Sequence, residues 1–447
     1  MLTKTFKRIP ILRIVRPFQE FVKLEASGGI LLLACTVLAL AWANSPWGKS
    51  YVDLWHTQAT IGIGGFILSK DLLHWINDGW MVVFFFVVGL EIKREVLAGE
   101  LASAKKAALP IVAALGGMIV PAAIYSIFNA GGAGAMGWGI PMATDIAFAL
   151  GALTLLGNRV PLALKVFLTA LAIVDDIGAV LVIALFYTTQ ISWLWLFIGG
   201  IILLALIVAN QVGVRSLLFY TLLGIGLWLA FLQSGVHTTI AGVLLAMTIP
   251  ARARIHRDAF LERSRALLSE FEQASGHSEN ILTNPGQQAA LQELETACEQ
   301  TETPLQRFEH ALHPWVTFAI MPIFALANAG VTFAGDVSAM LIHPVSIGVA
   351  AGLVLGKQLG ITLFTWLAVK SRLAVLPDGI TWKQIYGVGW LGGIGFTMSL
   401  FIATLAFDGT ELLTAAKLGI LTASLLAGIV GWMYLARNLA LAPAADE

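Results

Sequence analysis

Long apolar segments recur along the whole chain and constrain its fold more than any other feature. A helix needs about 20 apolar residues to cross the hydrocarbon core of a bilayer. Twelve segments approach this length, near 25–44, 73–92, 107–128, 138–157, 163–187, 191–209, 216–232, 236–250, 314–335, 343–369, 386–406 and 412–436. The chain is only 12% charged, about half the value of a soluble domain. The sequence therefore predicts an all-α polytopic membrane protein, with residues 1–447 forming a single domain of twelve transmembrane helices.

The balance of charges and the cysteines exclude several other classes of protein. Lys and Arg number 27 and Asp and Glu number 27, so the formal net charge is zero. Without a basic excess, no nucleic-acid partner is expected. Cys35 falls in an apolar segment and Cys298 in a polar one. Two cysteines so far apart predict neither a disulfide nor a metal cluster.

The positions of Lys and Arg predict the orientation of the chain. Of the 27 basic residues, 23 fall at the termini or in connections on one side of the predicted spans. Because basic residues favour the cytoplasmic side, both termini are expected in the cytoplasm. Apolar residues recur at helical spacing among basic ones over 9–24. This pattern predicts a helix lying in the membrane interface.

Two long connections interrupt the series of spans. The external connection 45–72 contains strand-like patches over 53–59 and 64–69. These patches favour a hairpin, with an irregular loop as the alternative. A lone hairpin is marginal in water, so a contact with a second copy in a homodimer is expected. The polar segment 251–313 is predicted to be a cytoplasmic insertion of two amphipathic helices, split at Asn284-Pro285-Gly286.

Four ionisable residues fall at mid-span positions, where charge is costly and therefore points to function. These residues are Asp145, Asp175, Asp176 and Lys357. Asp78 and Glu91 lie nearer span ends and are weaker candidates.

The adjacent aspartates predict a site for which a cation and protons compete. Neighbouring residues on a helix point about 100° apart, so Asp175 and Asp176 can face different surroundings. Burial favours protonation of a carboxyl group, whereas small hard cations prefer ionised oxygen ligands. Competition between these two states is the physical basis of antiport. Lys357 can pair with one aspartate or carry a proton itself.

Two of the charged regions coincide with breaks in the predicted helices. Pro141 precedes Thr144 and Asp145 and cannot donate a backbone hydrogen bond, so the fourth span is expected to open there. The eleventh span carries Gly392 and Gly393 within a glycine-rich segment. Two interrupted spans in separate halves of a transporter-like chain predict a binding site near the middle of the membrane. Asp145 and Lys357 are expected to compensate the partial charges of the exposed helix ends.

Several motifs in this chain resemble those of the NhaA family of sodium/proton antiporters, in order and over nearly the whole length. They are FFFVVGLEIKRE at 84–95, Thr-Asp within 139–147, Asp-Asp within 171–178, SGVHTTIAG at 234–242, EHALHPW at 309–315, PIFALANAGV at 322–331 and GWLGGIGFTMS at 389–399. The cytoplasmic connection before Glu309 is longer than the pattern leads us to expect.

The resemblance implies roles for individual residues. Asp175 and Asp176 match the paired aspartates that bind sodium and protons, with Thr144 and Asp145 beside them. Lys357 matches the lysine that pairs with the first aspartate, here Asp175. The residues implicated in pH sensing are Glu91, Arg94, Glu95, His237 and Glu309.

The resemblance also implies an architecture and an activity. Spans three to five and ten to twelve would form inverted repeats, and the broken spans four and eleven would cross. Cytoplasmic sodium or lithium would be exchanged for external protons under pH control, by a homodimer in the bacterial inner membrane. Separately from the resemblance, the paired carboxylates allow more than one proton for each cation, so electrogenic exchange is expected. No cofactor is expected, since only ions are transported.

Other functions remain open from the residues alone. An intramembrane aspartyl protease would need a Gly-x-Gly-Asp motif, which neither Asp145 nor Asp175 has, so an enzyme is not expected. A passive channel is disfavoured by buried titratable pairs. A proton-coupled carrier of another cation or small solute is the main alternative.

Overall fold

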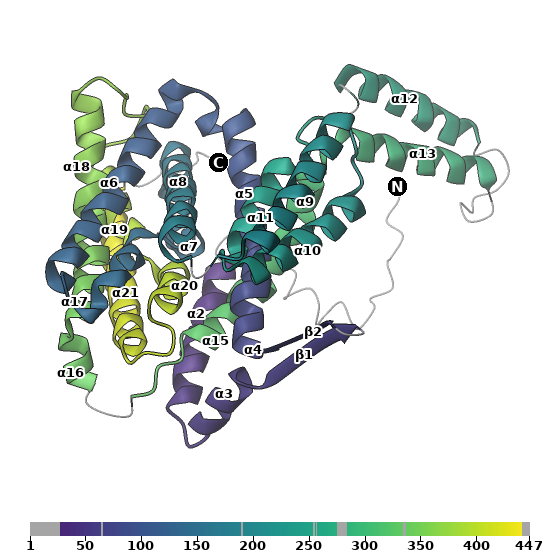
Figure 1. Cartoon of the computed structure of the whole chain (residues 1–447). Coiled ribbons are helices and arrows are strands. Elements are labelled where there is room, and N and C mark those ends of the chain that lie inside the picture. The colour runs from purple at the N-terminus through teal and green to yellow at the C-terminus, as the bar shows by residue number, and fades with distance from the viewer. Residues whose placement is uncertain are drawn as a thin grey trace, which may run out of the picture.

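The fold is helical apart from one short hairpin (Figure 1). The computed structural model describes residues 27–63, 66–188, 191–253, 255, 257–274, 284–333 and 337–439. The interfacial helix predicted over 9–24 lies outside these residues.

Among the described residues, seven helices are long and apolar enough to cross a membrane, or ten if each bent pair of helices is one span. The seven are Ala104–Asn129 (α6), Leu162–Phe186 (α8), Trp193–Val212 (α9), Leu217–Ser234 (α10), Pro304–Asn328, Pro344–Lys370 and Leu412–Asn438 (α21). Pro304–Asn328 comprises α14 (Pro304–Trp315), η6 (Val316–Ile320) and α15 (Met321–Asn328), and Pro344–Lys370 comprises α17 (Pro344–Ala351), η7 (Gly352–Gly356) and α18 (Lys357–Lys370).

Three bent pairs complete the candidate spans. Helices α2 (Ser27–Ala43) and α3 (Gly48–Trp55) bend by 115°, η3 (Ala133–Met142) and α7 (Ile146–Thr154) by 40°, and α19 (Trp382–Gly392) and α20 (Phe396–Phe407) by 43°. The last two pairs occupy the fourth and eleventh predicted spans, so both expected interruptions are present. The first half of the fourth span is a 3₁₀-helix.

The remaining elements are short or carry charges. They are α4 (Leu72–His74), η1 (Trp75–Trp80), α5 (Met81–Ala98), η2 (Glu100–Ala102), η4 (Gly157–Arg159), α11 (Thr238–Thr248) and α16 (Val337–Ile342). Segments η1, η6 and η7 are π-helical. Such wide turns inside helices often mark functional regions, and η7 ends directly before Lys357.

Glycines bring α6 and α18 into close contact in the core. A Cβ atom on Gly116 would lie 2.3 Å from the carbonyl oxygen of Gly360, and one on Gly360 would lie 2.1 Å from that of Gly116. Small residues at a membrane-helix interface permit this approach of backbones. The packing holds Lys357, at the start of α18, in the interior.

A hairpin forms in the predicted external connection, with strands β1 (Gln58–Ile63) and β2 (Phe66–Asp71) antiparallel. The first strand was expected over 53–59, and that position is wrong. Residues 48–55 instead form α3, where Tyr51 and Trp55 are buried four residues apart on one helical face. The Tyr51 hydroxyl donates to the carbonyl oxygens of Leu326 and Ala327, at 2.8 and 3.0 Å, which fastens α3 to the end of α15.

The polar insertion contains two helices packed against each other, α12 (Arg257–Gln273) and α13 (Pro285–Thr301). They extend away from the helix bundle at the upper right of Figure 1. Asn284 caps α13, as the Asn-Pro-Gly sequence leads us to expect. The insertion was expected to continue to 313, but Pro304 already begins α14, which is continuous with the next span.

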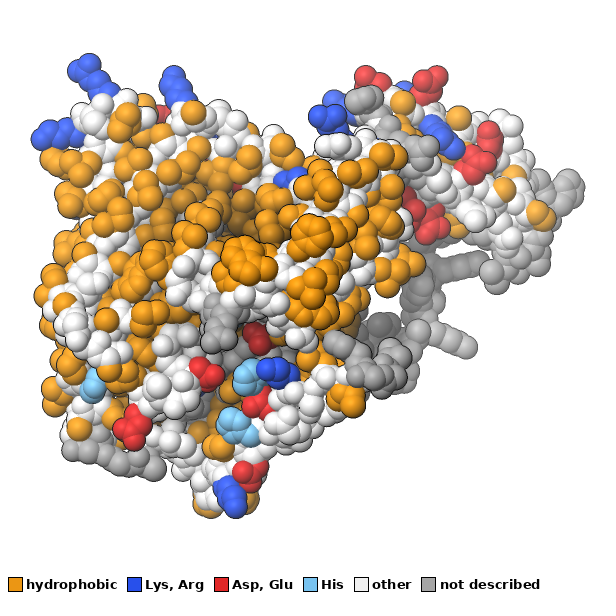
Figure 2. Space-filling view, viewed as in Figure 1, with side chains coloured by type: hydrophobic (Ala, Val, Ile, Leu, Met, Phe, Trp, Pro, Cys, Tyr) orange, Lys and Arg blue, Asp and Glu red, His pale blue; other side chains and the backbone are white. Residues whose placement is uncertain are grey.

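The exposed surface is divided into an apolar middle and two polar faces. Figure 2 shows a broad band of hydrophobic side chains, with Lys and Arg above it, on the side of the insertion. Acidic and histidine side chains gather below the band, on the side of the hairpin. We call these two sides the insertion face and the hairpin face.

Candidate ion-binding site

The two interrupted spans meet at their breaks. The backbone N–H of Asp145, between η3 and α7, donates to the carbonyl oxygen of Ile394, between α19 and α20, at 2.7 Å. The Ser399 hydroxyl donates to the carbonyl oxygen of Ile140 at 2.7 Å. Backbone groups freed by one break are therefore partly satisfied by the other, as the apolar interior requires.

Asp145 joins the beginnings of two helices. One of its carboxylate oxygens accepts a hydrogen bond from the backbone N–H of Phe148 at 3.1 Å and caps α7. The other accepts from the backbone N–H of Thr397, at 3.1 Å, and from the Thr397 hydroxyl, in the first turn of α20. Helix N-termini carry partial positive charge, so Asp145 compensates both, as expected.

Lys357 forms an ion pair with Asp175, and both side chains are fully buried. The same oxygen of Asp175 lies 2.7 Å from the Thr144 hydroxyl, which also lies 2.8 Å from the carbonyl oxygen of Gly392. One hydroxyl proton can serve only one of these acceptors at a time. The pair between Lys357 and Asp175 is the one that the resemblance implies. The other expectation for Lys357, compensation of a helix end, is not met, because Thr144 contacts the end of α19 instead.

Asp176 is buried beside this pair without a partner of its own. Its Oδ1 has no hydrogen-bond partner among the described residues, and neither has Oδ1 of Asp175. Electrostatic interactions reach Asp176 from Asp175, Glu91, Asp145 and Lys357. A buried oxygen without a donor is uncommon and needs an explanation. Carboxylate oxygens of this kind can bind a proton or serve as ligands of a hard cation.

Gly392 and Gly393 permit close packing around the break. A Cβ atom on Gly393 would lie 2.5 Å from the carbonyl oxygen of Leu353, in η7. One on Gly392 would lie 2.6 Å from the Ile361 side chain. Neither glycine has a positive φ. Glycine is therefore favoured at both positions because a side chain would meet neighbouring atoms, and not because of the backbone conformation.

Part of the predicted pH-sensing set forms an ion-pair cluster at the insertion face. Arg94 of α5 pairs with Glu309 of α14, and its other nitrogen lies 3.4 Å from a Glu95 oxygen. Glu95 also accepts a hydrogen bond from the backbone N–H of Glu100 at 3.0 Å. Glu91 has no hydrogen bond or ion pair within the described part of the chain.

His237 lies apart from this cluster, before the first residue of α11. Its Nδ1 is 2.8 Å from the Thr239 hydroxyl, and its Nε2 is 3.7 Å from a carboxylate oxygen of Asp78. The imidazole stands edge-on to the Phe401 ring of α20, with centroids 5.4 Å apart. The structure thus places the predicted pH-sensing residues in two groups and gives His237 a carboxylate neighbour.

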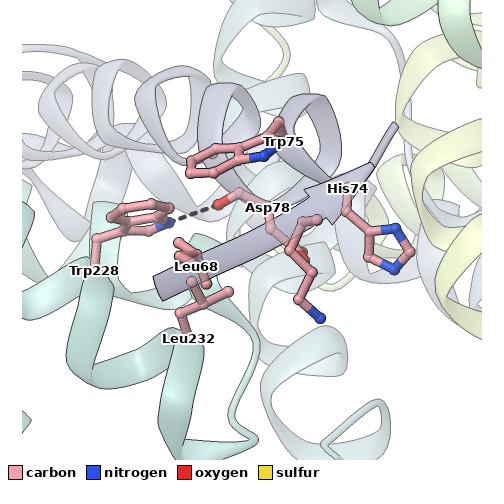
Figure 3. A pocket seen from close by; sticks show the side chains of 8 residues that line it. Leu68, His74, Trp75, Asp78, Trp228 and Leu232 are labelled. Carbon is pink, nitrogen blue, oxygen red and sulfur yellow. Dashed lines mark hydrogen bonds between the residues drawn. The ribbon is translucent and has the colours of Figure 1, made fainter. Parts of the chain in front are cut away.

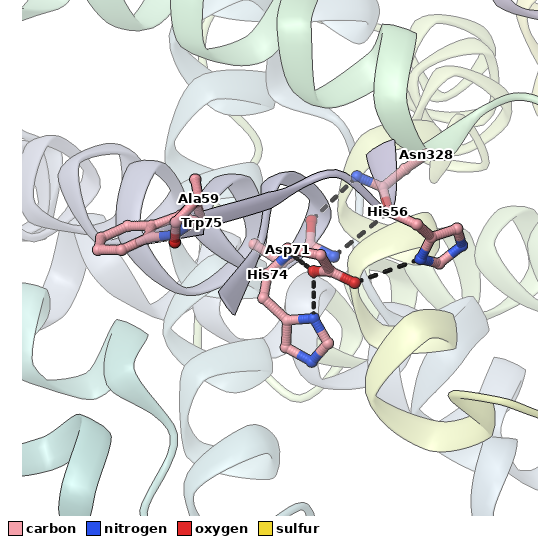
Figure 4. A network of polar contacts seen from close by, with 7 residues as sticks. His56, Ala59, Asp71, His74, Trp75 and Asn328 are labelled. Atoms are coloured by element: carbon pink, nitrogen blue, oxygen red, sulfur yellow. Dashed lines mark hydrogen bonds and ion pairs between the residues drawn. The ribbon is translucent and has the colours of Figure 1, made fainter. Parts of the chain in front are cut away.

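The base of the hairpin holds a separate polar network (Figure 4). Asp71 accepts hydrogen bonds from the Nδ1 atoms of His74 and His56, at 2.5 and 3.2 Å. Burial raises the pKa of the Asp71 carboxyl, but hydrogen bonds from both histidines and the charge of His74 outweigh it and place the pKa below its ordinary value. Buried Asn77 and Asn328 also bond to each other here.

A hollow beside this network lies between β2, η1 and α10 (Figure 3). Leu68, Trp75, Trp228 and Leu232 line it, and the Trp228 indole donates to the backbone carbonyl of Asp78 at 2.7 Å. Its free volume is about 10 Å³, which is at the lower limit for a single water molecule. It is therefore a packing gap and not a ligand site.

Thr397 and Ser399 are the site residues that sequence reasoning did not single out. Both fall within the motif 389–399, so the signal was present, but hydroxyl groups in apolar helices commonly bond to their own backbone.

No group of three or more His, Cys, Asp or Glu side chains that could hold a metal ion is found in the described ranges. Lys357 takes one oxygen of Asp175, so a cation would have to replace it there.

The chain is similar to known proteins over most of its length. The sequence profile of the family described as "Na+/H+ antiporter 1" matches residues 19–435. The chain is 55% identical over 426 residues to the Na(+)/H(+) antiporter NhaA of Oleidesulfovibrio alaskensis, covering 95% of each chain. It is 54% identical over 441 residues to NhaA of Koribacter versatilis, covering 98% of this chain and 95% of the relative. It is 52% identical over 423 residues to NhaA 2 of Syntrophotalea carbinolica, covering 94% and 96%.

Proposed function

Because this chain belongs to the Na+/H+ antiporter 1 family, we propose that it moves Na+ or Li+ out of the cytoplasm in exchange for external protons. The chain is a transporter of the bacterial multi-pass membrane class, not an enzyme. Both termini and the insertion face would lie on the cytoplasmic side of the membrane, in agreement with the basic residues on that face.

The observation that carries the proposal is the pair of unpartnered oxygens on Asp175 and Asp176. In the proton-loaded state, Asp176 is neutral and Asp175 is paired with protonated Lys357, so neither carboxyl group leaves an uncompensated charge in the apolar interior. With protons released, the two carboxylates provide hard oxygen ligands for a small cation, and the Thr144 hydroxyl oxygen is within reach of Asp175. Only one of these states can exist at a time, so cation and proton fluxes are coupled.

Lys357 provides a second element of competition. Its ammonium group occupies the Asp175 oxygen that a cation would use. Cation binding replaces this contact, and the positive charge of Lys357 is then without its partner. Two carboxyl groups and a lysine allow more than one proton for each cation, so we propose electrogenic exchange.

Alternating access would operate on the broken spans. The groups α6 to α8 and α18 to α21 each contain a broken element between long helices, which supports the proposed inverted repeats of spans three to five and ten to twelve in a twelve-span fold. Asp145 joins the beginnings of α7 and α20, so a movement of one changes the environment of the other.

Regulation and assembly are part of the same proposal. The Arg94–Glu309 pair links α5 to α14 near the insertion. Protonation of the acidic groups of this cluster would weaken the link and favour an inactive state at low cytoplasmic pH. The hairpin is proposed to pair with its copy in a homodimer.

The test is dissipation of a pH gradient in everted membrane vesicles on addition of Na+, Li+ or K+, from about pH 6.5 to about pH 8.5. We expect a response to Na+ and Li+ that grows with pH. Asp176→Asn and Asp175→Asn should abolish it, whereas Asp53→Asn, which changes an exposed aspartate of α3, should not. Full exchange by folded Asp176→Asn protein would contradict the assigned site. A response only to K+ or to an organic solute would favour the alternative, a proton-coupled carrier of another cation or small solute.

A further inference from the structure

The end of α11 is held by three other helices. Lys93 of α5 donates from Nζ to the carbonyl oxygens of Met247 and Ile249, at 2.7 and 2.5 Å. The Asn210 amide of α9 donates to the carbonyl oxygen of Thr248 at 2.8 Å, and the backbone N–H of Leu305, in α14, donates to that of Pro250 at 3.2 Å. The last carbonyls of a helix have no partner within it. Here the four carbonyls from 247 to 250 all find one on a neighbouring element.

Helices α5 and α11 are also in close backbone contact between their ends. A Cβ atom on Gly89 of α5 would lie 2.7 Å from the Ala246 side chain. One on Gly242 of α11 would lie 2.5 Å from the carbonyl oxygen of Val82. Interlocked backbones of this kind move as one body because a packed interface has few alternative arrangements.

The other end of α11 faces the beginning of the same partner helix. His237, the N-cap residue of α11, lies 3.7 Å from Asp78 of η1, which continues into α5. Helix α11 has 11 residues and spans about 16 Å at 1.5 Å per residue. Lys93 therefore bonds the two helices at the insertion face, while at the hairpin face His237 Nε2 lies near Asp78 without a hydrogen-bond partner among the described residues.

We infer that Lys93 is a positioning residue that fixes α11 on α5 and thereby sets the position of His237 against Asp78. The inference rests on the proposed function only for its effect on exchange. Arg94 and Glu309 form their pair next to Lys93 in the sequence and in the fold, so a shift of α5 at this cluster reaches His237 through α11. Charged groups around the junction are Glu91, Glu95 and Arg94 from α5 and Glu309 from α14, while the groups that Lys93 itself contacts are neutral carbonyls.

The test compares four variants of the full chain in detergent and in vesicles. Lys93→Met removes both hydrogen bonds and retains the apolar part of the side chain. Lys93→Arg retains donors for two carbonyls. Asn210→Ala loosens the same helix end from α9 and leaves the link to α5 in place. Lys105→Met, at an exposed position of α6, controls for the loss of one positive charge at this face.

Amide hydrogen exchange of residues 243–249 measures the junction independently of transport. We expect Lys93→Met to raise exchange rates there by at least about tenfold, and Lys93→Arg to restore protection. In vesicles, the pH midpoint of sodium-driven exchange should move by about half a unit or more in Lys93→Met, and stay near the wild-type value in Lys93→Arg, Asn210→Ala and Lys105→Met.

Three results would overturn the inference. Unchanged protection in Lys93→Met would show that the hydrogen bonds do not hold α11. Lost protection with an unchanged midpoint, or an equal shift in Asn210→Ala, would show that Lys93 is only a structural cap. If the wild-type chain shows no sodium response, the proposed function fails, while the hydrogen-exchange result still decides whether Lys93 fixes α11.

Discussion

Among the ion pairs of the described residues, the one between Lys357 and Asp175 has both side chains fully buried. Both side chains are removed from solvent, and among the described residues Asp175 also contacts Thr144. Removing one member of a buried pair leaves an uncompensated charge, which costs about 3–5 kcal/mol. We therefore expect Lys357→Ala to lower the midpoint of thermal unfolding in detergent, followed by tryptophan fluorescence.

A double variant separates the effect of the unpaired charge on stability from the effect of the lost side-chain packing. In Lys357→Ala with Asp175→Ala, no unpaired charge remains, so much of the lost stability should return although exchange is absent. An unchanged midpoint in Lys357→Ala alone would show that the pair contributes nothing to the folded state.

Some residues of the candidate site could be predicted from the sequence and others could not. Asp145, Asp175, Asp176 and Lys357 could be predicted because charge is rare inside a membrane. Thr397 could not be predicted, because a threonine in an apolar helix often bonds to the backbone of its own helix, and the sequence does not distinguish this case from a contact with another helix. Thr36, Thr365 and Thr404 each donate to the carbonyl four residues earlier, whereas Thr397 donates to Asp145.

At the scale of elements, the break in the eleventh span packs so closely against η7 that no space remains for a side chain at Gly393. We expect Gly393→Ala to destabilise the protein by about 1–3 kcal/mol, because its Cβ atom would meet a backbone carbonyl that cannot give way. The matched control is Gly200→Ala in α9, where an added Cβ atom would meet nothing within 4 Å. Thermal unfolding of both variants decides the matter, and equal midpoints would contradict the packing argument.

The hairpin base should respond to acid through Asp71. Its pKa is lowered in the folded state, so its contribution to stability is fully present above the unfolded value of about 3.9 and is lost as the pH falls through the lower folded value. We expect Asp71→Asn to be less stable than the wild type at neutral pH, and the difference to shrink below about pH 4. Unfolding midpoints of both proteins from neutral to acid pH measure it, and a constant difference would show that the carboxylate charge is not involved.

Elements were predictable where hydropathy or turn residues decide them. The ten candidate spans of the described residues, both interruptions and the split at Asn284-Pro285-Gly286 follow from such signals. The π-helical turns and α3 do not, because their backbone is set by tertiary contacts. In α3, the Tyr51 hydroxyl finds its partners 275 and 276 residues away, at a sequence distance that no local pattern records.

At the scale of the whole molecule, the insertion is a separate unit attached at one place. Buried residues of α12 and α13 include Leu267, Ala290 and Ala297. A deletion of the whole unit removes all of these residues at once. We expect a chain in which a short Gly-Ser linker replaces 257–301 to retain exchange in vesicles, with a shifted pH midpoint because the insertion adjoins α14 and Glu309. Complete loss of exchange from folded protein would show that the transporter depends on the insertion.

The way in which the insertion is attached has a practical consequence. Its two ends are joined by the hydrogen bond from Leu305 to Pro250 and a second one from Ile255 to Gln300. Paired helices that leave and return at one point form a stalk. A soluble domain fused between α12 and α13 would project from an otherwise featureless membrane protein and provide a landmark for aligning single-particle images.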